Sequence, residues 1–221
     1  MIIAIDGPAG SGKSSTAKQV AKRLGIIHLD TGAMYRAVTL FCLRKGIDFR
    51  DETGMAKAVS EIQISFTGSP PDTRTWLNGE DVSDAIRSDE VTKNVSDYCA
   101  VGVVREALVD QQRAIAKTGN LVCEGRDMTT VVFPSAEIKI FMTASVEERA
   151  KRRKLDFEKL GVSKTVEELA AEIAERDRKD SSRSNSPLRQ TDDATLLDTT
   201  GMTLEEQIEA IVQMGKPLLD K

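Results

Sequence analysis

The chain of 221 residues has few cysteines, histidines and aromatic residues, and these shortages exclude several classes of protein. Its three cysteines, Cys42, Cys99 and Cys123, are odd in number and lie in apolar stretches, so we expect buried thiols rather than a disulfide framework or a zinc site. The single histidine, His28, lies inside an apolar run and is predicted to be a core or edge residue rather than a catalytic one. We therefore predict a fold that needs no cross-links and no structural metal.

Long apolar runs and an excess of positive charge are also missing. No stretch approaches the ~18 apolar residues of a membrane span, and the first residues already form a predicted strand, so we expect a cytoplasmic protein without a signal peptide. The net charge of −4 argues against a polymeric nucleic acid as partner. Residues 149–189 nevertheless contain twelve Lys and Arg against eight Asp and Glu. Such a local basic segment suits a small polyphosphate substrate.

Residues 7–14 have the pattern G-x-x-x-x-G-K-[ST] between an apolar run and a helical stretch, which predicts a loop that binds the phosphates of a nucleoside triphosphate. Glycines let the backbone N–H groups curl around phosphate oxygens, Lys13 can reach the outer phosphates, and the hydroxyl of Ser14 can bind Mg²⁺. A dinucleotide-binding fold fits less well, because Ser15 stands where its third glycine is required. The predicted ATP-binding residues are Gly7, Pro8, Ala9, Gly10, Ser11, Gly12, Lys13, Ser14 and Ser15.

Apolar runs bounded by turn residues alternate with helical patterns along most of the chain. Five strands are predicted, at residues 2–5, 26–29, 121–124, 138–142 and 194–198. Helices are predicted at 13–24 and 103–117, and capping boxes at Ser145 with Glu148, Thr165 with Glu168 and Thr203 with Glu206 mark further helix starts. This alternation predicts an α/β fold, a five-stranded parallel sheet with helices on both faces.

The segment between the second and third strands breaks the alternation. Ile62, Ile64 and Phe66 recur with a period of two, and Asn78-Gly79 is a strong hairpin signal before residues 80–82. We predict a small antiparallel β insert at about 62–100 within a single domain of residues 1–221. A plain nucleotide-binding module does not require such an insert, whereas an enzyme that encloses a second substrate does.

Two predicted strands end in polar residues at the edge of the sheet where ligands bind in α/β proteins. Asp30-Thr31-Gly32 follows the second strand, with Arg36 close behind, and Gly125-Arg126-Asp127 follows the third. This convergence predicts a second binding site beside the phosphate loop.

Five segments together resemble the bacterial cytidylate kinase family. They read GPAGSGKSS, LDTGAMYR, VREAL, EGRDMTTVVFP and ERDRKDSSR, and they occur in the order and spacing of that family from residue 2 to the last helix. The chain departs from the family's common pattern at Ser14-Ser15, Thr31 and Thr129, which leaves the phosphate loop intact. The resemblance implies a P-loop nucleoside monophosphate kinase that transfers the γ-phosphoryl group of ATP to CMP or dCMP, with Mg²⁺ as cofactor.

The resemblance also implies roles for individual residues. Lys13, Arg126 and Asp127 are expected to be catalytic, and Ser14 to bind the metal. The expected CMP-binding residues are Thr31, Arg36, Ser96, Arg105, Arg126, Asp127, Arg176, Asp180 and Arg183. Among these, Ser96, Arg105, Asp127 and Arg183 would hold the cytosine, Arg36 and Arg126 the CMP phosphate, and Arg176 with Asp180 the sugar and phosphates. The insert would enclose the monophosphate, a basic helix pair near 150–165 would form a lid over ATP, and we expect a monomer.

Two alternatives remain open at this stage. One is a P-loop kinase with another acceptor, such as UMP, and the other is a switch protein that hydrolyses a nucleotide. Residues 198–201 match the D-x-x-G pattern of GTPases, but no N-K-x-D guanine-binding motif accompanies it. The insert and the set of arginines favour the kinase.

Overall fold

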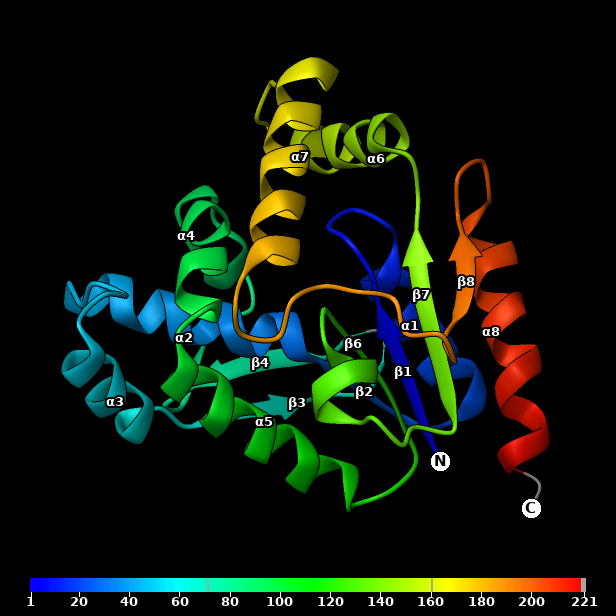
Figure 1. Ribbon diagram of the computed structural model, residues 1–221, viewed down its shortest axis with the longest axis horizontal. Helices are drawn as coiled ribbons and strands as arrows, with labels where there is room; N and C mark the ends of the chain where they lie inside the picture. The colour runs from blue at the N-terminus through cyan, green and yellow to red at the C-terminus, as the bar shows by residue number, and fades with distance from the viewer. Residues whose placement is uncertain (71, 160, 220–221) are drawn as a thin grey trace. The chain divides into compact units, whose positions relative to one another are not determined.

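The structure, a computed structural model, describes residues 1–70, 72–159 and 161–219 and divides into two compact units (Figure 1). The first unit consists of Met1–His28 and the chain from Asn120 onward, and the second consists of Leu29–Gly119. None of the helices in the described ranges is both long and apolar enough to cross a membrane.

In the described part of the chain, five strands form the main sheet in the order β2-β6-β1-β7-β8. Their bounds are β1 Ile2–Asp6, β2 Ile27–Asp30, β6 Leu121–Gly125, β7 Ile138–Thr143 and β8 Thr195–Asp198. Strand β1 runs parallel to β6 and to β7, and β7 runs parallel to β8. The predicted parallel sheet is confirmed, and its strand ends differ from the predicted ones by one residue at most. The phosphate loop and Arg126 therefore follow the carboxyl ends of adjacent strands, β1 and β6.

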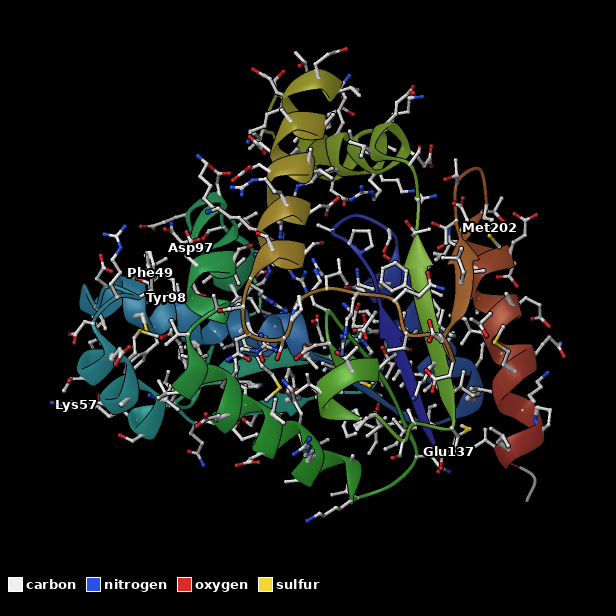
Figure 2. All side chains as sticks on the ribbon, in the orientation of Figure 1. Phe49, Lys57, Asp97, Tyr98, Glu137 and Met202 are labelled. Atoms are coloured by element: carbon white, nitrogen blue, oxygen red, sulfur yellow. The ribbon has the colours of Figure 1, made fainter. Side chains whose placement is uncertain are left out.

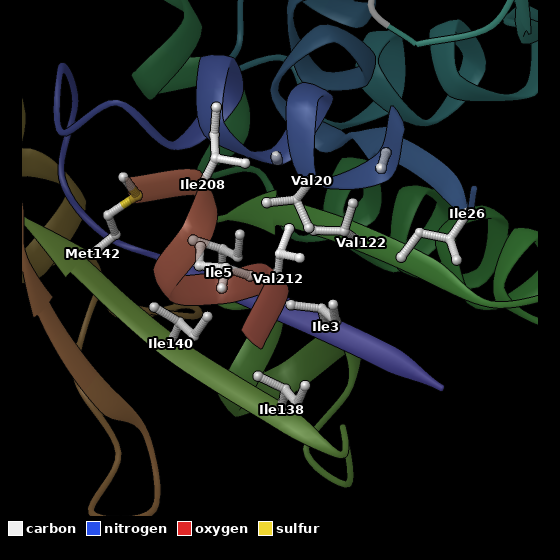
Figure 3. Packing of buried hydrophobic residues seen from close by; sticks show 13 residues of the cluster. Ile3, Ile5, Val20, Ile26, Val122, Ile138, Ile140, Met142, Ile208 and Val212 are labelled. Carbon is white, nitrogen blue, oxygen red and sulfur yellow. The ribbon is translucent and has the colours of Figure 1, made fainter. Parts of the chain in front are cut away.

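Two helices cover one face of this sheet. They are α1, Lys13–Leu24, and α8, Leu204–Leu219, which pack against each other. Figure 3 shows Val20 of α1 and Ile208 and Val212 of α8 beside the apolar side chains of the strands. Each buried aliphatic side chain of this kind stabilises the fold by ~1.5–3 kcal/mol. Helix α1 ends as the sequence predicts, because Gly25 adopts the left-handed conformation that stops a helix (φ 65°).

Helices α6, Val146–Lys159, and α7, Val166–Ser182, pack on each other around Ala150, Leu169 and Ile173. The helix pair is therefore longer than the predicted segment 150–165, which holds most of α6 and the cap of α7 but none of the turns of α7. The capping boxes predicted at Thr165 and at Thr203 are both present.

The capping box predicted at Ser145 is only half formed. The hydroxyl of Ser145 accepts a hydrogen bond from the backbone of Glu148, but the backbone N–H of Ser145 donates to Thr200 Oγ1 instead of Glu148. The carboxylate of Glu148 is engaged elsewhere, because it accepts a hydrogen bond from Arg152 Nε at 2.9 Å.

The second unit combines helices with the predicted antiparallel sheet. Its elements are α2 Thr31–Lys45, α3 Glu52–Glu61, β3 Ile64–Thr67, β4 Arg74–Leu77, β5 Glu80–Asp81, η1 Ala85–Arg87, α4 Asp89–Cys99 and α5 Gly102–Ala116. Strand β4 pairs antiparallel with β3 and β5. The predicted hairpin is confirmed, since Asn78 (φ 51°) and Gly79 (φ 83°) both have the positive φ that this turn needs.

Helices α2, α3, α4 and α5 form the body of the second unit. Tyr98 of α4 and Phe49 meet edge to face with ring centroids 5.8 Å apart, and both are labelled in Figure 2. The hydroxyl of Tyr98 donates to the carbonyl of Ile47 at 2.7 Å. Cys42 and Cys123 are buried as predicted, whereas Cys99, the last residue of α4, is only partly buried, and these three described cysteines form no disulfide. Burial raises the pKa of Cys42 to about 11.

Candidate nucleotide-binding site

The phosphate loop links β1 to α1 in a conformation that requires glycine at two positions. At Gly7 (φ 149°) a Cβ atom would lie 1.9 Å from the carbonyl oxygen of Met142. At Gly12 (φ 96°), the residue before α1, a Cβ atom would lie 2.8 Å from Oε1 of Gln207. A side chain at either position would collide with its neighbour or strain the backbone. The two glycines of the sequence motif are therefore set by the packing of β7 and α8 against the loop.

Lys13 lies inside the curve of this loop. Its ammonium group donates to the carbonyl of Pro8 at 2.7 Å and to Ser11 Oγ at 3.3 Å, and the residue is only 6% exposed. Burial and the charges of Arg126 and Arg176 lower the pKa of Lys13 well below its ordinary value, against a smaller opposing effect of Glu124. An anion placed here would stabilise the ammonium form. The loop thus has the local charge that a polyphosphate would complement.

Ser14 and Ser15 occupy the first turn of α1, where both are exposed. Within the described ranges, no group of three or more His, Cys, Asp or Glu could hold a metal ion. Mg²⁺ commonly keeps waters and takes most of its remaining ligands from substrate phosphates. An exposed hydroxyl at the loop fits such an ion, held jointly by Ser14 and a bound triphosphate.

Side chains from α6 and from the segment after β8 hold the outside of the loop. Arg149 donates to the carbonyl of Ala9 at 3.0 Å and to Asp177 Oδ2 at 2.6 Å. Arg152 donates to Thr199 Oγ1 at 3.0 Å and Thr199 Oγ1 donates to the carbonyl of Ser11 at 3.0 Å. The carbonyl oxygens of Ala9 and Ser11 thereby accept from an arginine and a threonine outside the loop.

These loop contacts are not predicted by the sequence patterns. Thr199 lies in the D-x-x-G segment, and Arg149 and Arg152 are predicted only as members of a basic segment. The spacing of the two arginines by three residues places them on one face of α6, and this was the signal that could have singled them out. Gln207 of α8 adds a further missed contact, because its Oε1 accepts a hydrogen bond from Thr16 Oγ1 at 3.0 Å.

Arg126, directly after β6, pairs with Asp180 of α7. Nε of Arg126 donates to Oδ2 of Asp180 at 2.8 Å, and the two side chains are 18% and 6% exposed. Burial opposes the ionisation of Asp180, but the charges of Arg126, Arg176 and Arg183 outweigh it and hold the pKa of Asp180 below its ordinary value. Arg183 is fixed by a hydrogen bond from its Nε to the carbonyl of Ser186 at 2.7 Å. The first unit therefore brings four of the predicted acceptor-site residues into one charged cluster.

Asp127 is buried at the start of a short π-helix, η2, Met128–Val132. The helix packs on β1, whose last residue, Asp6, accepts hydrogen bonds from the backbone N–H groups of Met128 and Thr129. Burial raises the pKa of Asp6, although the hydrogen bonds from Thr129 and Met128 oppose this shift. The sequence predicted that Asp127 follows the strand but gave no signal for the π-helix behind it.

The prediction that His28 is a core or edge residue is confirmed. Its Nε2 lies 3.2 Å from Oε1 of Glu124, and the two side chains are 1% and 4% exposed. Both side chains are therefore shielded from solvent, as expected for core residues.

The remaining predicted acceptor residues lie in the second unit. Arg36 of α2 donates through Nη1 to Thr92 Oγ1 at 2.8 Å and to the carbonyl of Ile86 at 3.1 Å. Arg105 of α5 lies over the ring of Tyr35 at 5.2 Å and donates to the carbonyl of Cys99 at 3.0 Å. Thr31 is the buried first residue of α2, and Ser96 is half-buried on α4. Both arginines are held by neighbours in their own unit.

A lysine-bearing phosphate loop at the carboxyl edge of a parallel α/β sheet, beside a paired arginine and aspartate, defines a P-loop kinase. The profile of the family described as "Cytidylate kinase" matches residues 3–216, so the chain belongs to the cytidylate kinase family. It is an ATP-dependent nucleoside monophosphate kinase.

Known proteins similar to this chain agree with that assignment. A cytidylate kinase of Lactiplantibacillus plantarum is 49% identical over 96% of this chain and 93% of the relative. A bifunctional pantoate ligase/cytidylate kinase of a Nostoc species is 51% identical over 96% of this chain, which spans 40% of that longer protein. Among solved structures, an uncharacterized protein from Eubacterium ventriosum matches with a TM-score of 0.53 at 14% identity over 97% of both chains. That last likeness concerns the fold alone.

Proposed function

We propose that this chain transfers the γ-phosphoryl group of ATP to CMP or dCMP, with ADP and CDP or dCDP as products. The observation that carries the proposal is the pair of charged sites in the first unit. One is the phosphate loop closed around Lys13, and the other is the cluster of Arg126, Arg176, Asp180 and Arg183. The charges of Arg126 and Arg176 act on Lys13, so the two sites are electrostatically coupled. A kinase needs such coupling because both substrates bring phosphate to one place.

On the donor side, the backbone of residues 7–15 would bind the phosphates of ATP, and Lys13 would neutralise the β- and γ-phosphates. Phosphoryl transfer depends mainly on positioning and charge neutralisation, so a lysine aimed at the transferred group is the expected catalyst. Ser14 would hold Mg²⁺ together with the triphosphate, and the bound ion would neutralise charge as it develops on the phosphate oxygens. The arginine-rich helix α6 and its partner α7 would form a lid over the nucleotide.

On the acceptor side, Arg36 and Arg126 would hold the phosphate of CMP, and Arg176 with Asp180 would hold the sugar and phosphates. Thr31 would line the same site, and the insert of residues 62–100 would enclose the monophosphate. The ion pair between Arg126 and Asp180 supports this assignment, because it fixes one guanidinium in a partly exposed position. A preset arginine aligns the acceptor oxygen for in-line attack.

Cytosine recognition would follow from matching donors with acceptors. Cytosine presents acceptors at O2 and N3 and a donor at its 4-amino group, whereas uracil presents a donor at N3 and an acceptor at C4. Arg105 and Arg183 can only donate, and an ionised Asp127 can only accept. With Ser96 and Asp127 at the amino group and the arginines at O2 and N3, CMP is matched and UMP is mismatched at two positions.

The surroundings of the reaction are also part of the proposal. The substrates are small nucleotides, and the acidic composition suits neither a polymeric nucleic acid nor an anionic membrane as partner. We propose that the protein is located in the cytoplasm and that it is a monomer. Gel filtration with light scattering would test the monomeric state directly.

A coupled assay of ADP release, with and without CMP, tests the proposed reaction. We expect ADP release to depend on CMP and to match the CDP formed mole for mole. Release that proceeds at the same rate without any acceptor would instead identify a nucleotide-hydrolysing switch, and release that depends on UMP but not on CMP would identify a kinase with another acceptor.

A further inference from the structure

Asp6 stands where the phosphate loop and the segment that carries Asp127 both begin. It is the last residue of β1, its side chain is fully buried, and Gly7 of the loop follows it directly. Its register partner on β6 is Gly125, which precedes Arg126 and Asp127. One buried carboxylate therefore adjoins the start of the donor site and the start of the acceptor site.

The carboxylate of Asp6 binds the start of η2 through three hydrogen bonds. Oδ1 accepts from the backbone N–H of Met128 at 2.8 Å. Oδ2 accepts from the backbone N–H and from the Oγ1 hydroxyl of Thr129, each at 2.7 Å. The first N–H groups of a helix have no partner inside the helix. Asp6 supplies that partner from a neighbouring strand.

Asp6 occupies the capping position that Asp127 would usually have at this helix start. An aspartate that precedes a helix usually caps the helix by accepting from its first N–H groups. Asp127 precedes η2, yet its side chain makes no such capping bond, because Asp6 already binds the N–H groups of Met128 and Thr129. The position of the start of η2 therefore depends on Asp6 and not on a capping bond from Asp127.

We propose that Asp6 and the hydroxyl of Thr129 are positioning residues for base recognition. They fix the start of η2, so that Asp127 directs its carboxylate to the 4-amino group of cytosine. The inference rests on the proposed function, in which Asp127 recognises that group. Recognition of this kind needs the recognising atoms held within about 0.5 Å by their supporting residues. Three hydrogen bonds in a buried site provide such support.

A matched pair of substitutions at Thr129 tests the role of the hydroxyl. Thr129→Val keeps the shape and the backbone N–H but removes the hydroxyl, whereas Thr129→Ser retains it. Loss of one hydrogen bond corresponds to roughly a two- to tenfold effect. We expect Thr129→Val to reduce the ratio of kcat/KM for CMP to that for UMP by this factor, with the KM for ATP within about twofold of wild type. Thr129→Ser should keep the wild-type ratio.

Asp6→Asn tests the carboxylate itself. In either orientation of the amide, its NH2 group would face a backbone N–H of η2, so a donor would oppose a donor. We expect Asp6→Asn to reduce the ratio of kcat/KM for CMP to that for UMP more than Thr129→Val does. If Asp6→Asn does not fold, the comparison of Val with Ser at position 129 still decides the question. A thermal midpoint that falls while the CMP/UMP ratio stays at the wild-type value in these variants would show a structural role only and would overturn the proposal.

Asp127→Asn, measured in parallel, separates this inference from the proposed function. If Asp127→Asn narrows the ratio but the substitutions at Asp6 and Thr129 do not, the base contact stands and the positioning role is wrong. If Asp127→Asn itself leaves the ratio unchanged, Asp127 does not recognise the base and the positioning role falls with it, while CMP-dependent ADP release still supports the kinase reaction. The base contact of Asp127 and the positioning role of Asp6 and Thr129 are both confirmed by one pattern of results. In that pattern, the ratio of kcat/KM for CMP to that for UMP is reduced in Asp127→Asn, Thr129→Val and Asp6→Asn but is unchanged in Thr129→Ser.

Discussion

Nη1 of Arg149 donates to the carbonyl oxygen of Ala9 at 3.0 Å, and this bond ties the first turns of α6 to the phosphate loop. The guanidinium is buried and also pairs with Asp177. Arg149→Met removes both of these bonds and also the one from Nε to the carbonyl of Ala144 at 2.9 Å. Because a hydrogen bond to a charged group stabilises by about 1.5–3 kcal/mol, we expect kcat/KM for ATP to fall about 10- to 100-fold.

Steady-state kinetics with each substrate varied in turn checks this prediction, and Asp177→Asn serves as its control. The control removes the ion partner of Arg149 but keeps the donor to Ala9. The kcat/KM for ATP should therefore fall less in Asp177→Asn than in Arg149→Met. A larger change in the KM for CMP than in the KM for ATP, in Arg149→Met, would contradict a role at the donor site.

Lys13→Met should abolish most of the phosphoryl transfer while the protein stays folded. The substitution keeps the length of the side chain but removes the charge that neutralises the transferred phosphate. Loss of one such contact costs ~3–4 kcal/mol of transition-state stabilisation, a hundredfold or more in kcat. The control is Lys22→Met on the exposed side of α1, which should behave as wild type. A folded Lys13→Met protein with near-normal kcat would refute the assigned role.

Arg36→Met should weaken the acceptor site without affecting the donor site. The substitution removes the proposed contact with the CMP phosphate and the bonds to Ile86 and Thr92. We expect the KM for CMP to rise and kcat to fall, because a misplaced acceptor loses in-line geometry. The KM for ATP should stay near its wild-type value, and a rise there instead would assign Arg36 to the donor.

Alkaline conditions should destabilise the protein through the buried thiol of Cys42. Burial raises its pKa from 9.0 to about 11 in the folded state, so the unfolded chain loses its proton first as the pH rises. The contribution of this thiol to the free energy of unfolding is complete below pH 9 and is lost as the pH approaches 11. Urea unfolding at several pH values should show a steeper loss of stability for wild type than for Cys42→Ala. Parallel curves would show that Cys42 does not titrate as the structure indicates.

The parts of the fold that depend on local sequence could be predicted. The phosphate loop, the five strands and the Asn78-Gly79 hairpin follow from glycine placement and from periodic burial, which are local properties. The missed features depend on contacts between distant segments. Thr199 donates a hydrogen bond to the carbonyl of Ser11, 188 residues away in the sequence. Thr129 donates one to Asp6, 123 residues away. No local sequence pattern predicts either bond. The half-formed cap at Ser145 has the same cause, because Thr200 takes the place of Glu148.

In the candidate site, too, the features set by local sequence could be predicted and those set by distant contacts could not. Lys13 and Ser14 are placed at the start of α1 by one local motif, and this helix start agrees with the predicted helix at 13–24. The partners of Asp180 and Arg183 depend on how α7 packs and on the turn at Ser186, and sequence spacing alone gave only their membership in a basic segment. The roles of the acceptor residues remain predictions from the family resemblance.

The most direct test of the proposed base selectivity is a reaction in which CMP and UMP compete for the enzyme. With γ-labelled ATP and equal amounts of the two monophosphates, we predict labelled CDP in excess of labelled UDP by a factor on the order of a hundred, because two mismatched polar contacts disfavour UMP. The same reaction with dCMP in place of CMP should yield labelled dCDP. Equal labelling of CDP and UDP, or label released as inorganic phosphate without either diphosphate, would contradict the account.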